Sequence, residues 1–189
     1  MNITEQHAKK LLELMNPGLC NGAGDGTPGN MCVEQAVALT FGEPLNDTPT
    51  CVDGDVQRFS IMINDLDEWP PNAIRAKTMR RFAIAQLGSA GVIDGKVFEA
   101  KRKLIWDEYL AKRKPIWDEY QSNCLPHLET LCESLVQLLI ELGSPGTKFL
   151  YLVALSAREV REKQKAYYTC AKSDVTEKKT LLIESKGAE

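Results

Sequence analysis

The stretch AKRKLIWDEYLAKRKPIWDEY, residues 100–120, contains two nearly identical copies of a ten-residue sequence. AKRKLIWDEY at 100–109 returns as AKRKPIWDEY at 111–120, with nine of the ten aligned positions identical and a period of 11. Eleven residues correspond to about 3.67 residues per turn over three turns, so equivalent residues stay close to one side of a helix. The repeat therefore predicts one long helix over about 94–121.

An apolar stripe runs along this predicted helix. Phe98 begins the stripe. Steps of seven, four, seven and four residues then lead to Ile105, Tyr109, Ile116 and Tyr120, and this spacing keeps all five on one face. Together with the two tryptophans of the repeat, the stripe predicts a surface for helix packing or self-association. The candidate interaction residues are Ile105, Trp106, Tyr109, Ile116, Trp117 and Tyr120.

Pro115 is the one position at which the second copy differs from the first, where Leu104 stands. Inside a helix, proline removes one backbone hydrogen bond and costs about 3 kcal/mol or introduces a kink, so we expect a long, kinked helix.

Arg102 lies one turn before Trp106, which permits a cation–aromatic contact between them.

Apolar residues at helical spacing and clear start and stop residues predict helices elsewhere as well. Thr4 can cap the first helix, and Thr50 or Asp53 can cap the third. The expected helices cover about 4–16, 30–41, 53–66, 72–87, 126–142 and 147–167. The last two are joined by a short Gly-Ser-Pro-Gly loop and should form an antiparallel hairpin.

The predicted fold class is all-α: a helical bundle with the long repeat helix and a C-terminal helical hairpin. One division of the chain gives a small Cys- and Gly-containing region at 1–91, the repeat helix and hairpin at 92–172, and a flexible tail at 173–189. One compact domain overall is the alternative.

Composition excludes several classes of protein. The 189 residues carry a net charge of -3, 43% are hydrophobic, and no run approaches the roughly 20 apolar residues needed to cross a bilayer. The start MNITEQHAKKLLELMN lacks the pattern of a signal peptide. With a pI near 5.6, binding to duplex DNA is disfavoured. We expect a protein of the cytoplasm with no membrane span and no nucleic-acid partner.

The segment CNGAGDGTPGN, residues 20–30, is a glycine-rich loop. It follows no predicted strand, which excludes a dinucleotide-binding motif. It does end at the start of a predicted helix, where free backbone amides can hold a small anionic ligand. The candidate ligand-binding residues are Gly22, Gly24, Gly26, Asn30, Glu34 and Asp47.

The six cysteines form no CxxC pair, and free thiols are expected. Two groups could still hold zinc, although no cofactor is predicted outright. The candidate metal ligands are Cys32 and Cys51 in the first half and Cys124, His127 and Cys132 in the second, the latter needing a fourth ligand from elsewhere. Only two histidines are present, so an activated cysteine nucleophile is disfavoured and no catalytic residue is assigned.

The stretch GNMCVEQAVALTFGEPLNDTPTCV, residues 29–52, resembles the core of a family of uncharacterised phage-encoded and bacterial proteins. These proteins show a Gly-rich loop, an MCVxEAV-like helix start, GEP, and a Ser/Asn-Asp turn before a second cysteine. Their tandem KxxAPAWAEY repeats are similar to LAKRKPIWDEY at 110–120. Related sequences often have His after the Asp of the turn, whereas Thr48 follows Asp47 here. The resemblance, over about 18–90 and 98–121, implies a phage or mobile-element origin and work in a bacterial cytoplasm.

The leading hypothesis is a non-enzymatic interaction protein that meets a protein partner, or a second copy, through its helical surfaces. Interference with a host factor or defence component follows from the implied origin alone. The alternatives are a protein that binds a small ligand, a nucleotide or a metal at the Gly-rich loop, and a virion-associated structural protein.

Overall fold

Helices are the regular elements of the residues that the computed structural model describes, which are 1–69, 72–117 and 125–154, with the side chains of 114–117 left aside. They are α1 (Glu5–Met15), α2 (Val33–Thr40), α3 (Gly54–Asn64), α4 (Asn72–Ala85), α5 (Gly95–Trp117), α6 (Leu125–Glu141) and the short 3-10 helix η2 (Pro145–Phe149). The all-α prediction is confirmed.

Helix starts follow the capping chemistry expected from the sequence. The Thr4 hydroxyl accepts a hydrogen bond from the His7 amide, and the Thr4 amide donates back to His7 Nδ1, which closes a capping box. Asp53 caps α3 by accepting hydrogen bonds from the amides of Asp55 and Val56.

Helix α2 begins three residues later than the predicted start at 30. The Asn30 amide donates to the Thr27 carbonyl, and the Met31 carbonyl accepts from the Cys20 amide, so both residues belong to the preceding loop. Cys32 then serves as the cap, its Sγ accepting a hydrogen bond from the Gln35 amide. These two hydrogen bonds follow from the path of the loop, and the helical spacing of apolar residues gives no information about them.

Helix α5 has 23 residues and continues through Pro115 to Trp117. A kink at Pro115 would therefore redirect only the last residues of the described helix. The predicted final helix opens differently: Pro145–Phe149 is a 3-10 helix, and α-helix resumes at 151–154. The rest of that expected helix, and residues 118–121 of the expected repeat helix, lie outside the described part of the chain.

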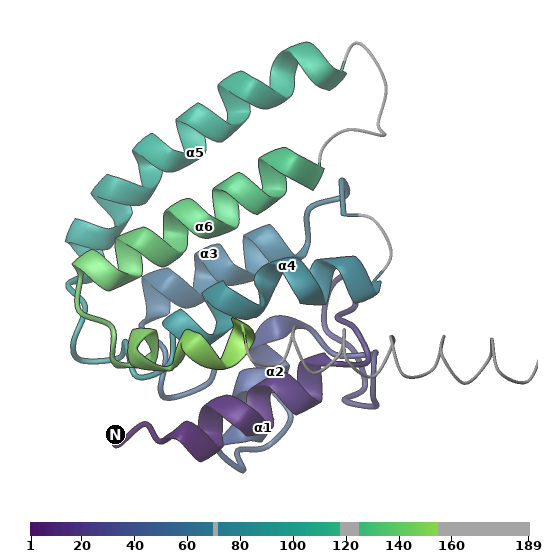
Figure 1. Cartoon of the computed structure of the whole chain (residues 1–189), viewed down its shortest axis with the longest axis vertical. Coiled ribbons are helices and arrows are strands. Elements are labelled where there is room, and N and C mark those ends of the chain that lie inside the picture. Colours follow the sequence, from purple (N-terminus) through teal and green to yellow (C-terminus); the bar gives the residue numbers. More distant parts are fainter. Residues whose placement is uncertain (70–71, 118–124, 155–189) are drawn as a thin grey trace, which may run out of the picture. The chain divides into compact units, whose positions relative to one another are not determined.

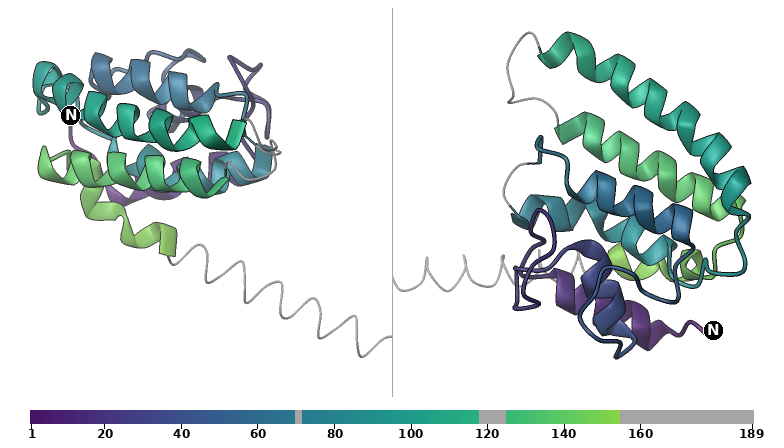
Figure 2. Two further views of the ribbon diagram at one scale, coloured as in Figure 1. Left: turned by 90° about the horizontal axis from the view of Figure 1, so that it is seen from above. Right: turned by 180° about the vertical axis from the view of Figure 1, so that it is seen from behind.

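Residues Met1–Leu152 form one compact unit, in which the helices pack against one another. Helix α5 lies antiparallel to α6 at one edge and also contacts α3, while α4 contacts α6, α1 and α2 (Figures 1 and 2). The division expected at 91–92 falls between α4 and α5, inside this unit. The core between these helices includes the fully buried side chains of Leu11, Met79, Phe82, Phe98 and Leu135.

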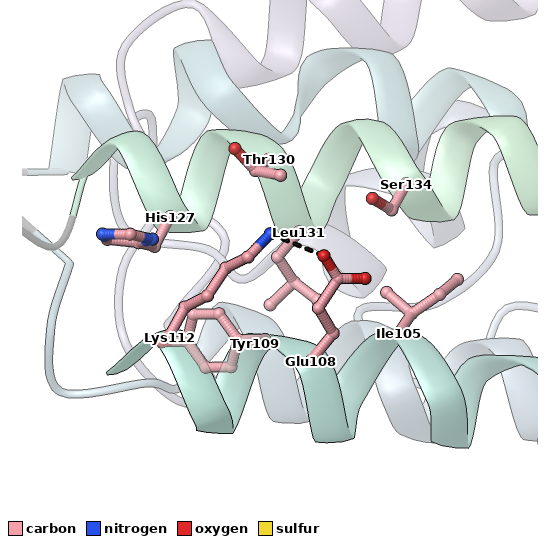
Figure 3. A pocket seen from close by; sticks show the side chains of 8 residues that line it. All are labelled: Ile105, Glu108, Tyr109, Lys112, His127, Thr130, Leu131 and Ser134. Atoms are coloured by element: carbon pink, nitrogen blue, oxygen red, sulfur yellow. Dashed lines mark hydrogen bonds and ion pairs between the residues drawn. The ribbon is translucent and has the colours of Figure 1, made fainter. Parts of the chain in front are cut away.

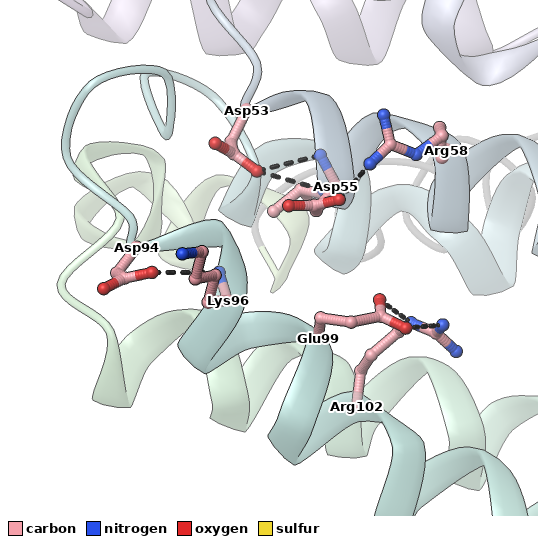
Figure 4. Close-up of polar contacts among 8 residues, drawn as sticks. Asp53, Asp55, Arg58, Asp94, Lys96, Glu99 and Arg102 are labelled. Carbon is pink, nitrogen blue, oxygen red and sulfur yellow. Dashed lines mark hydrogen bonds and ion pairs between the residues drawn. The ribbon is translucent and has the colours of Figure 1, made fainter.

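The N-termini of α3 and α5 meet at an acidic junction (Figure 4). Asp94 accepts hydrogen bonds from the amides of Lys96 and Val97 and so begins α5, as Asp53 begins α3. Gly95 allows the close approach, because a Cβ there would overlap Asp55 Oδ2. Asp53 and Asp94 therefore each have a structural task as helix caps.

Within the described ranges, none of the helices combines the length and the apolar character that crossing a membrane requires.

Candidate functional site

Three polar side chains from different elements meet in the core. Glu34, near the start of α2, is fully buried and accepts a 2.9 Å hydrogen bond from Gln86 Nε2, just after α4. Ser60 of α3 is also fully buried and lies close enough to Glu34 to lower the pKa of its carboxyl group. Glu34 Oε2, Ser60 Oγ and Gln86 Oε1 have no further hydrogen-bond partner among the described residues. We call these three residues the buried polar centre.

Burial raises the pKa of Glu34 to about 7, because the ionised form is poorly solvated in the core. Ser60 and Gln86 pull the pKa down by smaller amounts, and the charge of Asp47 pushes it further up. Near neutral pH, Glu34 is thus a mixture of carboxylate and carboxylic acid. The neutral form has an O–H that can donate to one of the unpartnered oxygens, so the centre can hold one proton inside the protein.

Glu34 and Asp47 are the two predicted ligand-binding residues that the structure relates through their charges. The charge of Asp47 also raises the pKa of Cys32, and the charge of Glu34 raises the pKa values of both Cys32 and Cys51. These four predicted residues therefore lie in one region of the protein. Sequence reasoning missed Ser60 and Gln86. The sequence did indicate that Ser60 could be buried, because it follows Val56 by four residues and precedes Ile63 by three, which places it on the same apolar side of the helix.

The amides of the Gly-rich loop are engaged within the protein. Gly22 donates to Asp65 Oδ1 at 2.8 Å, Gly24 to Gln35 Oε1 at 2.9 Å, and Gly26 to the Asn30 carbonyl at 3.1 Å. An anion at this loop would have to displace bonds that fasten the loop to α2 and α3. The loop is therefore built as a tether between elements, and the geometry does not favour an anion site.

The described cysteines are buried thiols with raised pKa values. Burial raises the pKa of Cys32 to about 11 and those of Cys51 and Cys132 to about 12, and it also raises the pKa of Cys20. At neutral pH these thiols are almost entirely protonated. Since the thiolate is the nucleophile, their surroundings do not activate these thiols for nucleophilic chemistry.

The predicted metal ligands on α6 diverge. His127 borders a groove beside α5, whereas Cys132 borders a groove beside Lys77 and Arg81 of α4. Cys124 lies outside the described residues. Among 1–69, 72–117 and 125–154, no group of three or more His, Cys, Asp or Glu side chains is placed to hold a metal ion.

The described part of the predicted interaction stripe packs inside the chain. Tyr109 is buried, and Ile105 and Trp106 are half-buried. The Trp106 ring lies 5.6 Å from the ring of Phe59 on α3 and 5.2 Å from that of Tyr109. The side chains of Ile116, Trp117 and Tyr120 lie outside the described part.

The predicted cation–aromatic contact involves a different ring. Arg102 lies 4.6 Å over the ring of Phe59, which belongs to α3, and also pairs with Glu99 (Figure 4). Phe59 replaces the expected Trp106 because the cation reaches across the helix interface. Spacing along one helix carries no information about that neighbour.

The groove between α5 and α6 is too small for an organic ligand (Figure 3). Ile105 and Tyr109 border it on one side and His127 and Leu131 on the other, and its volume is about 20 Å³. That volume holds about one water molecule, whereas ligand pockets enclose roughly 300 to 1,000 Å³.

Another side of α5 carries the most exposed large hydrophobic side chain among the described residues of the helix. Leu104 is 71% exposed, and Val97, seven residues earlier and hence about 20° away, is 41% exposed. Ala100 and Ala111 lie on the same side and are exposed. We call Val97, Ala100, Leu104 and Ala111 the outer strip. In the sequence, Leu104 is the single position at which the two copies of the repeat differ.

Exposed charges border the outer strip on both sides. Lys103 pairs with Asp107 on one side, and on the other Lys112 pairs with Glu108 (Figure 3) and Lys101 with Glu141 of α6. The strip is thus an apolar line framed by opposite charges, a pattern typical of helix–helix contact surfaces.

The chain matches no protein-family model, no curated protein sequence and no solved structure.

Proposed function

We propose that this chain is a non-enzymatic interaction protein that binds a protein partner through the outer strip of α5. The observation that carries the proposal is the 71% exposure of Leu104 in the middle of a long helix whose buried residues, Phe98 and Tyr109, lie on another side. A contiguous exposed apolar surface with a polar rim is typical of protein–protein interaction sites, and the outer strip has this form.

The chemistry of the other candidate groups supports contact over catalysis. The thiols of Cys32, Cys51 and Cys132 have pKa values raised by burial, and the Gly-rich loop uses its amides to bind Asp65 and Gln35. These groups have structural tasks, whereas Leu104 has none within the described fold. The outer strip therefore accounts for a feature that stability does not require.

The resemblance to phage-encoded and bacterial proteins supports a place of action. A protein of that origin would work in a bacterial cytoplasm and interfere with a host factor or a defence component. The mode of action is binding, so the activity would depend on surface residues of α5 and not on a reactive side chain.

Site-specific photocrosslinking in bacterial cells tests the proposal. A photoreactive amino acid replaces Leu104 in the full chain, and a matched variant carries it at Ile140, which is 43% exposed on α6. We expect irradiation to give a covalent protein adduct from position 104 and none from position 140. Equal labelling at both positions, or no adduct from position 104, would contradict a contact surface on α5.

A further inference from the structure

We propose that a second copy of this chain occupies the outer strip, with the two α5 helices antiparallel and centred on Leu104. The inference rests on the proposed function, since it names the occupant of the same surface. Its basis is that the strip and the charges beside it are complementary to themselves after a two-fold rotation.

The apolar residues match by size in this arrangement. A two-fold axis at Leu104 places the two Leu104 side chains together and brings residues equally far before and after that position opposite one another. Val97 lies seven residues before Leu104 and Ala111 seven after it. The larger side chain of each copy therefore meets the smaller side chain of the other, which lets the helices approach evenly along the strip.

The charges match as well. At 100° per residue, Lys101 and Glu108 lie on one side of the strip, and Lys103 and Asp107 lie on the other. The two-fold rotation brings each side against the same side of the second copy, in reversed direction. Lys101 then faces Glu108 of the second copy, and Lys103 lies near Asp107 of the second copy.

The alternative orientation lacks this complementarity. In a parallel, in-register pair, the two-fold axis runs along the helices and brings one side of the strip against the opposite side of the second copy. Lys101 would then lie near Lys103 of the second copy, and Glu108 near Asp107 of the second copy. Like charges facing each other across a helix pair disfavour that arrangement. Among the four charges nearest to Leu104, the two lysines at 101 and 103 precede it and the two acids at 107 and 108 follow it, and this order favours the antiparallel pair.

The bordering charges are free to change partners at little cost. Lys103 and Asp107 form an intrachain pair with side chains 69% and 53% exposed, and the Glu108 side chain in its pair with Lys112 is 67% exposed. Exposed pairs of this kind contribute little to stability, so exchanging them for contacts between copies is not prevented by the fold.

The position of α5 leaves the strip accessible within the described unit. The helix lies at the edge of the bundle, where α6 and α3 contact its inner side (Figures 1 and 2). Its 23 residues give a contact of at most about 35 Å in length. A single pair of helices is a small interface, so the dimer should be weak and should weaken further at high salt.

Charge exchange between two variants tests the antiparallel pairing. Sedimentation equilibrium of the full chain at low salt should show a reversible monomer–dimer equilibrium. Lys101→Glu and Glu108→Lys should each weaken the dimer at least tenfold, because each places like charges together twice. An equimolar mixture of the two variants should recover dimerisation, since the mixed pair restores opposite charges at both contacts. The double variant should recover it too.

Two further variants separate the surface from general effects. Leu104→Glu should give a monomer with an unchanged circular dichroism spectrum, whereas Ile140→Glu, on the exposed side of α6, should dimerise as the unmodified chain does. A chain that is monomeric at every concentration, or charge variants without recovery on mixing, would overturn the second-copy inference. If position 104 nevertheless crosslinks to a different protein, the proposed function stands while this inference fails. If it crosslinks to nothing, both fail.

Discussion

Gln86 Nε2 donates a 2.9 Å hydrogen bond to Glu34 Oε1 in the interior of the protein, and both side chains are fully buried. The contact joins the start of α2 to the end of α4, while Ser60 brings α3 to the same place. A carboxyl group at the junction of three helices makes the stability of the fold depend on its protonation.

The first prediction concerns pH. The folded protein holds the Glu34 proton with a pKa of about 7, against an ordinary glutamate pKa of 4.5, so proton binding favours the folded state. This contribution is fully present below pH 4.5 and is lost as pH rises through about 7. The free energy of unfolding should therefore fall by about 3 kcal/mol from this group across that window. Urea unfolding at pH 4.5, 6 and 8 measures the change.

Glu34→Gln isolates the effect, because glutamine has nearly the shape of the protonated side chain and cannot ionise. The variant should lose this part of the pH dependence and become more stable than the unmodified chain at pH 8. Glu13→Gln, at an exposed position on α1, is the matched control and should leave the profile unchanged. Parallel profiles for Glu34→Gln and the unmodified chain would show that Glu34 does not titrate in this range.

The second prediction concerns thiol reactivity. A pKa raised from 9.0 to about 11, as at Cys32, lowers the thiolate fraction about 100-fold. In a chain with Cys124→Ser and Cys170→Ser, Cys32, Cys51 and Cys132 should react with a thiol reagent at least 100-fold more slowly in the native state than in urea. Cys20 should also react more slowly in the native state, because burial raises its pKa. Rapid native labelling of any of the four, identified by peptide mapping, would place that cysteine at the surface.

Capping residues and apolar spacing were sufficient to predict much of the fold. Thr4, Asp53 and the leucines of α6 specify helix positions locally, and the observed helices lie within a few residues of the expected ones. The start of α2 was wrong by three residues because Asn30 and Met31 are held by hydrogen bonds to Thr27 and Cys20. Those bonds depend on the path of the loop, which local sequence does not encode.

The candidate sites were less predictable for a related reason. The repeat correctly placed Ile105 and Tyr109 on one face of α5, yet periodicity cannot say whether such a face meets the same chain or another. The structure packs Tyr109 inside and leaves Leu104 exposed. Likewise, the composition of the loop indicated Gly22 and Gly24 as amide donors, but their acceptors, Asp65 and Gln35, appear only in three dimensions.

The third prediction concerns the Gly-rich loop. A Cβ at Gly24 would overlap the Asn30 carbonyl oxygen, which is backbone and cannot turn aside. Gly24→Ala should therefore destabilise the protein by about 3 kcal/mol, in the range of overpacked sites. Gly54→Ala is the matched control: its Cβ would meet only Arg58 Nη1 at 3.8 Å within α3, so it should stabilise by about 0.5 to 1 kcal/mol. The sign of the two changes in melting temperature should differ.

The last prediction contrasts the two sides of α5 within one helix. Phe98 is fully buried and its ring lies 6.4 Å from that of Phe59, so Phe98→Ala leaves a cavity and should cost about 3 to 5 kcal/mol of unfolding free energy. Leu104→Ala removes an exposed side chain and should change that free energy by less than about 0.5 kcal/mol. Chemical denaturation should be followed at a protein concentration where the chain is monomeric, so that association does not contribute. A large loss on Leu104→Ala under these conditions would mean that Leu104 supports the fold of the single chain, and the outer strip would then lose its standing as a surface kept for binding.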